Sequence, residues 1–173
     1  LPVVYMAHNT FSTAKSMGSR CLMVAGASLA APNGYTIRVW TSLRAVAAVQ
    51  ENSGSAPVLL AFESLRQWLR PAVHRRLKEQ TEDANCRGVC LPLFPKKIPG
   101  SYWLNVWWCS VLIGAVAKRF DCRVIHAQSH FAAAAVSRAL RKCDKRRMVF
   151  DLHGVDIEEA ISDGRLEANS TFH

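Results

Sequence analysis

The sequence predicts an α/β domain built on an open parallel sheet with helices on both faces. Apolar strand patterns alternate with helical patterns along the chain, and the connections between them are short. Three of the predicted strands, within residues 2–7, 122–126 and 147–152, run into polar clusters that contain histidine. Alternating strands and helices call for parallel strands joined by right-handed crossovers. The polar clusters should then share the carboxyl edge of the sheet, where ligands bind in open α/β folds.

The first part of the chain predicts two strands with a helix between them. Residues 2–7 read as a buried strand. Apolar side chains within residues 13–31 approximate one helical face, and Pro32-Asn33-Gly34 supplies the residues expected at a helix end. Residues 35–41 alternate as a second strand, whereas residues 44–58 are only weakly patterned.

The rest of the chain continues the alternation. A helical pattern over residues 61–80 is broken at Pro71, which has no amide hydrogen to donate. The elements expected after it are strand 89–93, helix 101–120, strand 122–126, helix 130–142, strand 147–152 and the start of a helix at 155–162. This order predicts a single Rossmann-like domain over residues 1–173. The chain begins at Leu1 and stops at His173 without a capping signal, so we expect a piece of a longer protein.

The composition is that of an ordinary globular protein with an excess of positive charge. The formal net charge is +9, from 22 basic and 13 acidic residues. Arg138, Arg141, Lys142 and Lys145 follow the spacing of one helix face. Such a face is either solvated or a surface for anionic lipid, and an anionic membrane surface is therefore among the expected partners. No nucleic-acid partner is expected, because no nucleic-acid-binding motif accompanies the charge.

The longest apolar stretch, residues 102–117, predicts a helix packed on a face of the sheet. It is too short to cross a bilayer, which needs about 20 apolar residues. Its tryptophans and the nearby Lys96 and Lys97 leave contact with a membrane surface as an alternative. The six cysteines lack the spacing of a zinc site or a disulfide framework, which indicates reduced thiols. The expected location is the cytoplasm, either free or at the periphery of a membrane.

Motifs of the common α/β enzymes are missing. No G-x-G-x-x-G follows the first predicted strand, no P-loop lysine is present, and residues 26–30 lack the second glycine of a nucleophile elbow. These absences argue against a dehydrogenase, an NTPase and an α/β-hydrolase. His126 and His130 are four residues apart, but one should end a strand and the other begin a helix. We therefore expect no metal site.

The polar clusters suit a polyhydroxylated ligand. Gln128, Ser129 and the histidines at 126 and 130 supply mixed hydrogen-bond donors and acceptors, which sugars require. The alternative is that each histidine caps a helix or satisfies a buried carbonyl group.

Two segments resemble the family 4 glycosyltransferases. Residues 121–135 (DCRVIHAQSHFAAAA) are similar to a D-x-I-H-x-H-x-x-x-x-A segment of that family, and residues 149–154 (VFDLHG) resemble its next strand, which ends in a His-Gly pair. The opening strand, Asn33-Gly34-Tyr35 and Val39-Trp40-Thr41 are similar to the start of the same domain. The resemblance covers nearly the whole chain.

The resemblance implies the N-terminal, acceptor-binding half of a retaining GT-B hexosyltransferase. The nucleotide-sugar donor would be bound mainly by a C-terminal domain that has no counterpart here, with no resident cofactor and no metal. His153 would be the catalytic residue beside the transferred sugar. Lys15 and Gly18 would approach the donor phosphate where many members of the family have a Gly-Gly pair. The residues expected to bind the acceptor are His8, His126, Gln128, Ser129 and His130.

On this reading the partners are a nucleotide-sugar donor and a carbohydrate or glycolipid acceptor. Two other functions stay open on the residues alone. One is a sugar- or glycolipid-binding module without catalysis, and the other is a metal-dependent hydrolase built on the histidines.

Overall fold

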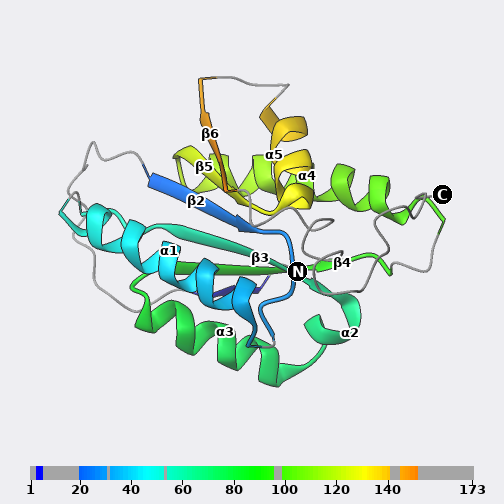
Figure 1. Ribbon diagram of the computed structural model, residues 1–173, viewed down its shortest axis with the longest axis horizontal. Helices are drawn as coiled ribbons and strands as arrows, with labels where there is room; N and C mark the ends of the chain where they lie inside the picture. The colour runs from blue at the N-terminus through cyan, green and yellow to red at the C-terminus, as the bar shows by residue number, and fades with distance from the viewer. Residues whose placement is uncertain are drawn as a thin grey trace, which may run out of the picture.

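The computed structural model describes residues 3–5, 20–30, 32–52, 54–95, 99–140 and 145–151. Its strands form one six-stranded sheet in the order β1-β4-β3-β2-β5-β6. Neighbouring strands from β4 to β6 pair in parallel, and β1 pairs with β4 in the antiparallel direction at the edge. Helices lie on both faces of this sheet (Figure 1). The predicted fold class, a Rossmann-like open sheet with helices on both faces, is confirmed for its five parallel strands. The predicted parallel direction of the first strand is wrong, because β1 runs antiparallel to β4.

The bounds of the elements show the alternation of strand and helix. The strands are β1 (Val3–Tyr5), β2 (Arg20–Ala25), β3 (Val58–Ser64), β4 (Arg87–Leu93), β5 (Cys122–Gln128) and β6 (Arg147–Asp151). The helices are α1 (Gly34–Glu51), α2 (Leu65–Trp68), α3 (Pro71–Asp83), α4 (Ser101–Arg119) and α5 (His130–Leu140).

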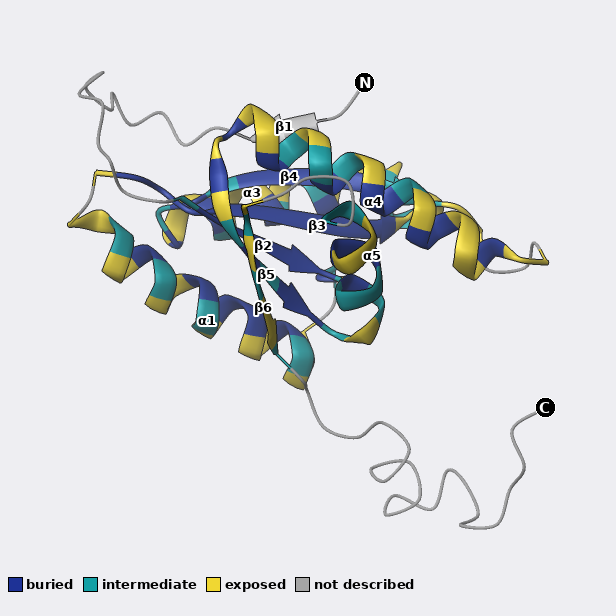
Figure 2. Cartoon of the chain, turned by 90° about the horizontal axis from the view of Figure 1, so that it is seen from above, coloured by how far each residue is buried: buried dark blue, intermediate teal, exposed yellow. Residues whose placement is uncertain are grey.

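Two hydrophobic cores lie on opposite faces of the sheet. Helices α4 and α5 pack on one face, where Leu22 and Val24 of β2 point. Helices α1 and α3 pack on the other face, where Met23 and Ala25 point. A strand covered on both faces is apolar at successive positions, which is why β2 is one continuous apolar run. Figure 2 shows the central strands buried along their length and the helices exposed only on their outer sides.

The prediction of a helix over residues 13–31 is wrong where the structure describes it. Residues 20–25 form β2, the central strand, and Cys21 to Ala25 are all buried. A short apolar run fits a buried strand and a buried helix equally well when only its periodicity is considered. Burial on both sides, which only the assembled sheet provides, decides in favour of the strand.

The predicted strand over residues 35–41 is also wrong, because these residues belong to helix α1. Asn33 caps this helix, and its side-chain Oδ1 accepts a hydrogen bond of 2.8 Å from the amide of Thr36. Pro32-Asn33-Gly34 therefore begins a helix rather than ending one. Val39, Trp40 and Leu43 then pack against the sheet at helical spacing.

The second half of the chain follows the prediction closely. Strands β4, β5 and β6 and helices α4 and α5 occupy the expected segments, and α4 packs on the sheet as predicted. Residues 61–64 differ, since they complete β3 beside β4 instead of opening a helix. The predicted break at Pro71 is confirmed, because α2 ends at Trp68 and Pro71 begins α3, at a position where its missing N–H has no partner to lose. The helix expected at 155–162 lies outside the described residues.

The strand order creates a switch point between β2 and β5. From β2 the chain moves to β3 and β4 on one side, and then crosses to β5 and β6 on the other. Ala25 and Gln128, the last residues of β2 and β5, pair in register at this point. Ligands of open α/β sheets bind at the carboxyl edge beside such a reversal. None of the helices among the described residues combines the length and the apolar character that a membrane span requires.

Candidate ligand-binding site

The loop that follows β2 is held in place at the switch point by a tyrosine of α1. The phenolic oxygen of Tyr35 accepts hydrogen bonds from the amides of Gly26 (2.9 Å) and Ala27 (3.3 Å). The same hydroxyl donates to the carbonyl oxygen of Gln128 at 3.0 Å. Burial raises the pKa of Tyr35 to about 12, with a smaller contribution from the charge of Glu63. The phenol therefore remains a donor at neutral pH.

The same loop is held from the neighbouring strand by a buried carboxylate. Glu63 of β3 has 0% of its surface exposed. Its Oε2 accepts a hydrogen bond of 2.5 Å from the hydroxyl of Ser28, and its Oε1 accepts one of 2.7 Å from the amide of Leu29. Arg76 of α3 adds a third contact by donating to the carbonyl oxygen of Ala30 at 3.0 Å. Residues 26–30 are thus fixed by side chains from three different elements.

Gly26 passes very close to the start of helix α5. A Cβ atom at this position would lie 2.2 Å from Ser129 Oγ and 2.9 Å from the amide nitrogen of Ala132. Ser129 itself has a positive φ of 107°, which is uncommon for a residue other than glycine. Its Oγ accepts a hydrogen bond of 3.3 Å from the Ala132 amide and so caps α5. The contact between loop and helix therefore leaves no room for a side chain at position 26.

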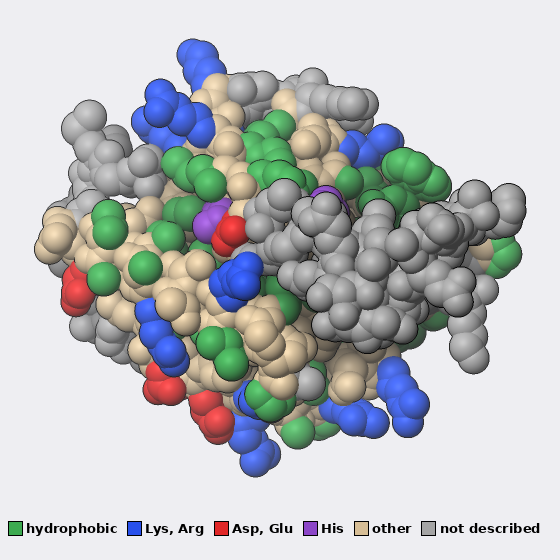
Figure 3. Space-filling model, viewed as in Figure 1, with side chains coloured by type: hydrophobic (Ala, Val, Ile, Leu, Met, Phe, Trp, Pro, Cys, Tyr) green, Lys and Arg blue, Asp and Glu red, His purple; other side chains and the backbone are tan. Residues whose placement is uncertain are grey.

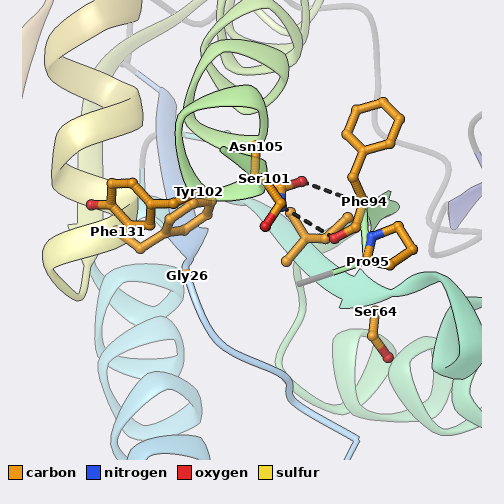
Figure 4. A pocket seen from close by; sticks show the side chains of 9 residues that line it. Gly26, Ser64, Phe94, Pro95, Ser101, Tyr102, Asn105 and Phe131 are labelled. Atoms are coloured by element: carbon orange, nitrogen blue, oxygen red, sulfur yellow. Dashed lines mark hydrogen bonds between the residues drawn. The ribbon is translucent and has the colours of Figure 1, made fainter. Parts of the chain in front are cut away.

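A pocket of about 460 Å³ opens at this edge of the sheet, on the face covered by α4 and α5. Gly26, Ser64 and Leu93 contribute from the carboxyl ends of β2, β3 and β4. Tyr102 and Phe131 contribute from the first turns of α4 and α5, and Figure 4 shows their side chains close to each other. Most of the lining is apolar or aromatic, with a few hydroxyl groups. This composition is typical of small-molecule sites.

Two aromatic contacts and one amide shape the pocket wall. The rings of Tyr102 and Phe131 meet edge to face, with centroids 5.9 Å apart. The ring of Phe94 lies in the same relation to Trp108, at 5.8 Å. Asn105 accepts a hydrogen bond of 2.8 Å from the amide of Phe94 and donates one of 3.2 Å to its carbonyl oxygen (Figure 4). Asn105 therefore fixes the end of β4.

The electrostatic surroundings of the pocket favour negative charge. Helices α4 and α5 both begin at its wall, and neither has an acidic residue in its first turn. Amide groups at a helix N-terminus carry a partial positive charge that attracts anions. His130, the first residue of α5, is exposed beside Phe131.

The histidine and glutamine predicted on β5 lie on the opposite face of the sheet from the pocket. Ile125 and Ala127 point into the core under α4 and α5, so the alternate residues His126 and Gln128 point to the other side. The Nε2 atoms of His126 and Gln128 are 3.2 Å apart, and His126 Nε2 is 3.9 Å from Asp151 Oδ2. Gln128 is fully buried.

The other predicted site residues fall into two groups. Ser129 and His130 lie at the start of α5, where Ser129 is occupied as a cap and the His130 ring meets the edge of Phe150 at 5.8 Å. The predicted residues outside the described part of the chain are His8, Lys15, Gly18 and His153. In the described ranges, no three His, Cys, Asp or Glu side chains gather closely enough to hold a metal ion.

Sequence reasoning missed the residues that build the pocket and its loop. Tyr35 was placed in a strand and Glu63 in a helix, so neither was expected at the sheet edge. Glu63 did leave a signal, because it is the single charged residue at the end of the apolar run VLLAFE. The aromatic residues Tyr102 and Phe131 left none, since they lie 29 positions apart in the sequence and meet only through packing.

The predicted basic helix face falls partly outside the described residues. Helix α5 ends at Leu140, so Lys145 lies beyond it. Arg141 and Lys142 are outside the described residues. Figure 3 shows the lysine and arginine side chains of one face at several separate places rather than gathered in one patch. The spacing argument for an anionic membrane surface depended on a continuous helix through residue 145, and that premise fails.

Comparisons with known proteins identify no family. No protein-family model matches the sequence, and no curated protein matches it. Among solved structures, the chain is similar to a universal stress protein whose structure was determined in complex with cAMP. The two are 7% identical, the match covers 78% of this chain and 98% of that chain, and the TM-score is 0.42.

These findings overturn the assignment to the family 4 glycosyltransferases. No glycosyltransferase is among the matches, so the predicted activity, enzyme class, nucleotide-sugar donor and glycosyl acceptor are wrong, and the sugar-binding alternative gains no support. Ser129 and the alanines of segment 121–135 have a structural explanation. Ser129 caps α5, and Ala132 and Ala135 are small enough to pack closely on the sheet. Any strand followed by a closely packed helix meets the same requirements.

Proposed function

We propose that this domain binds a small molecule that combines a flat aromatic ring with an anionic group, as a nucleotide does. The observation that carries the proposal is the aromatic pocket at the carboxyl edge of the sheet, where two helices begin. Open α/β sheets bind ligands at this edge, next to the reversal of strand order.

The pocket suits a ring in both size and lining. Its volume of about 460 Å³ lies in the range of roughly 300–1,000 Å³ typical of small-molecule sites. Tyr102 and Phe131 offer aromatic faces and edges, against which a planar ring packs favourably. The hydroxyl of Ser64 adds a hydrogen-bonding group that orients a ligand.

The charge distribution supports an anionic group at the same end. The first turns of α4 and α5 line the pocket and carry no acidic side chains that would oppose an anion. The net charge of +9 favours the approach of an anion from solution. The exposed His130 at the start of α5 is the side chain that we propose to contact this group.

Calorimetric titration with AMP, adenosine and inorganic phosphate separates the two parts of the proposal. AMP should bind more tightly than adenosine or phosphate, because only AMP occupies both the ring pocket and the helix ends. Phe131→Ala removes one wall of the pocket and should weaken AMP binding by about 10-fold, the equivalent of 1.4 kcal/mol from a lost aromatic contact.

A matched control lies on the same helix as Tyr102. Trp107 does not line the pocket and is 48% exposed, so Trp107→Ala should leave AMP binding unchanged. Equal losses of AMP affinity in Phe131→Ala and in the control variant would contradict a site for an aromatic ring. An affinity for phosphate equal to that for AMP would contradict it too. Absence of binding by all three probes would overturn the proposed function.

We further propose that the domain works in the cytoplasm, a reducing compartment. Cys21, Cys86, Cys90, Cys109 and Cys122 are buried and free. Unpaired thiols of this number persist where disulfides do not form. Mass spectrometry after alkylation of protein denatured without reductant should find all of these cysteines modified, and a disulfide among them would contradict this location.

A further inference from the structure

The most unusual buried group in the described residues is the carboxylate of Glu63. It has no exposed surface, and no Lys, Arg or His of the described residues forms an ion pair with it. Burial of a carboxylate without a cation is costly unless hydrogen bonds satisfy its oxygens. The Glu63 carboxylate accepts hydrogen bonds from the Ser28 hydroxyl and the Leu29 amide, and both donors belong to the loop after β2.

We infer that Glu63 is a positioning residue for the proposed ligand site, acting through the loop of residues 26–30. The inference rests on the proposed function. Glu63 points to the α1 and α3 face, because its neighbours Phe62 and Ser64 lie on the α4 and α5 side, in the core and at the pocket. It therefore cannot contact a ligand in the pocket directly.

A continuous set of contacts joins Glu63 to the pocket wall. Its two oxygens hold Ser28 and Leu29, and the loop places Gly26 at the pocket edge. Gly26 in turn lies against Ser129 and Ala132 at the start of α5, next to Phe131. Since no space is left between Gly26 and the start of α5, a shift of the loop must also shift the pocket wall at that helix. The carboxylate thereby sets the shape of the pocket from the far side of the sheet.

The loop also explains why a carboxylate suits this position. Ser28 needs an acceptor for its hydroxyl hydrogen, and Leu29 needs one for its amide. An ionised carboxylate offers two acceptor oxygens, whereas glutamine offers one oxygen and a donor amide. Glutamine at position 63 cannot accept from both donors as the carboxylate does, so Glu63→Gln should weaken the hold on the loop with almost no change in volume.

The test combines Glu63→Gln, Ser28→Ala and their double variant with AMP as the probe. AMP affinity should fall by roughly 3- to 30-fold in Glu63→Gln, the range of effects transmitted by residues without ligand contact. Ser28→Ala should give a smaller loss. The double variant should lose less affinity than the sum of the two single losses, because both changes act on the contact between Ser28 and residue 63.

Two further measurements separate positioning from general stability. Amide exchange at Leu29 in the unliganded protein should quicken in Glu63→Gln, and this readout does not depend on any ligand. Glu82→Gln, on an exposed side chain of α3, is the matched control and should change neither exchange nor affinity. Ser28 is exposed, so Ser28→Ala should fold even if Glu63→Gln does not.

The outcomes that overturn the inference are distinct from those that overturn the proposed function. If Phe131→Ala weakens AMP binding but Ser28→Ala and Glu63→Gln leave it unchanged, the positioning role of Glu63 is contradicted and the proposed ligand site is not. Additive losses of AMP affinity in the double variant would also contradict the positioning role of Glu63. A wild-type domain that binds no AMP overturns the proposed function and, with it, this inference.

Discussion

Tyr35 and Gln128 are 93 residues apart in the sequence and are joined by a hydrogen bond of 3.0 Å between the phenol and a backbone carbonyl oxygen. The bond links the first turn of α1 to the end of β5. Through the amide of Gly26, the same phenolic oxygen also holds the end of β2. One side chain therefore ties together the two strands and the helix that meet at the switch point.

Tyr35→Phe should lower the free energy of unfolding by about 0.5–1.5 kcal/mol, because it removes the hydrogen bonds of the phenol while the Gly26 amide and the Gln128 carbonyl oxygen stay bonded to each other. Urea unfolding followed by circular dichroism measures the change. Tyr102→Phe removes a hydroxyl from a half-exposed tyrosine and is the control. Equal effects in the two variants would contradict the clamping role of Tyr35.

Gly26→Ala should destabilise the domain by about 1–3 kcal/mol through overpacking against Ser129 and the backbone of Ala132. Gly34→Ala is the matched control, because a Cβ atom there meets nothing within 4 Å. Gly34 is also helical, so alanine should stabilise the protein by up to about 1 kcal/mol. The unfolding temperature should fall in Gly26→Ala and rise in Gly34→Ala. An unchanged unfolding temperature in Gly26→Ala would contradict the close contact between the loop and α5.

Asn33→Ala should cost about 1 kcal/mol of stability, since it removes the side-chain oxygen that accepts from the amide of Thr36. Asn52 ends the same helix without a left-handed backbone conformation, so Asn52→Ala should have little effect. Chemical denaturation of both variants measures the difference. A helix cap at residue 33 is incompatible with a strand at 35–41. Unchanged stability in Asn33→Ala would therefore contradict the cap and favour the strand.

The buried thiols predict a loss of stability at alkaline pH. Burial raises the pKa of Cys86, Cys90 and Cys109 from 9.0 to about 12. Above pH 9 these groups ionise in the unfolded chain but stay protonated in the folded one. The unfolded state then binds fewer protons, so the stabilisation present below pH 9 declines progressively toward pH 12.

Unfolding midpoints in urea between pH 8 and pH 10.5 test this dependence, and a midpoint that rises over this range would contradict it. Reaction with a thiol reagent supplies an independent readout. At pH 8 the folded protein should react slowly, because the thiolate is the reactive form, and urea should accelerate the reaction.

Local patterns determined most of the second half of the chain. The helical periodicity of α4 and α5 and the compact apolar strands β4, β5 and β6 identified these elements near their observed bounds. Their regular alternation was enough to establish a parallel sheet with helices on both faces. These features could be predicted because each depends on residues within one or two turns or along one strand.

Only the tertiary structure decided the identity of β2 and α1 and the position of the site. Residues 20–25 form a strand because β3 and β5 flank them and both faces are covered, a condition that no local pattern records. The partners of Glu63 and Tyr35 lie tens of residues away, and the pocket collects side chains from the ends of separate strands and helices. Such contacts exist only after the strand order has formed, because the order brings the carboxyl ends of distant segments to one edge.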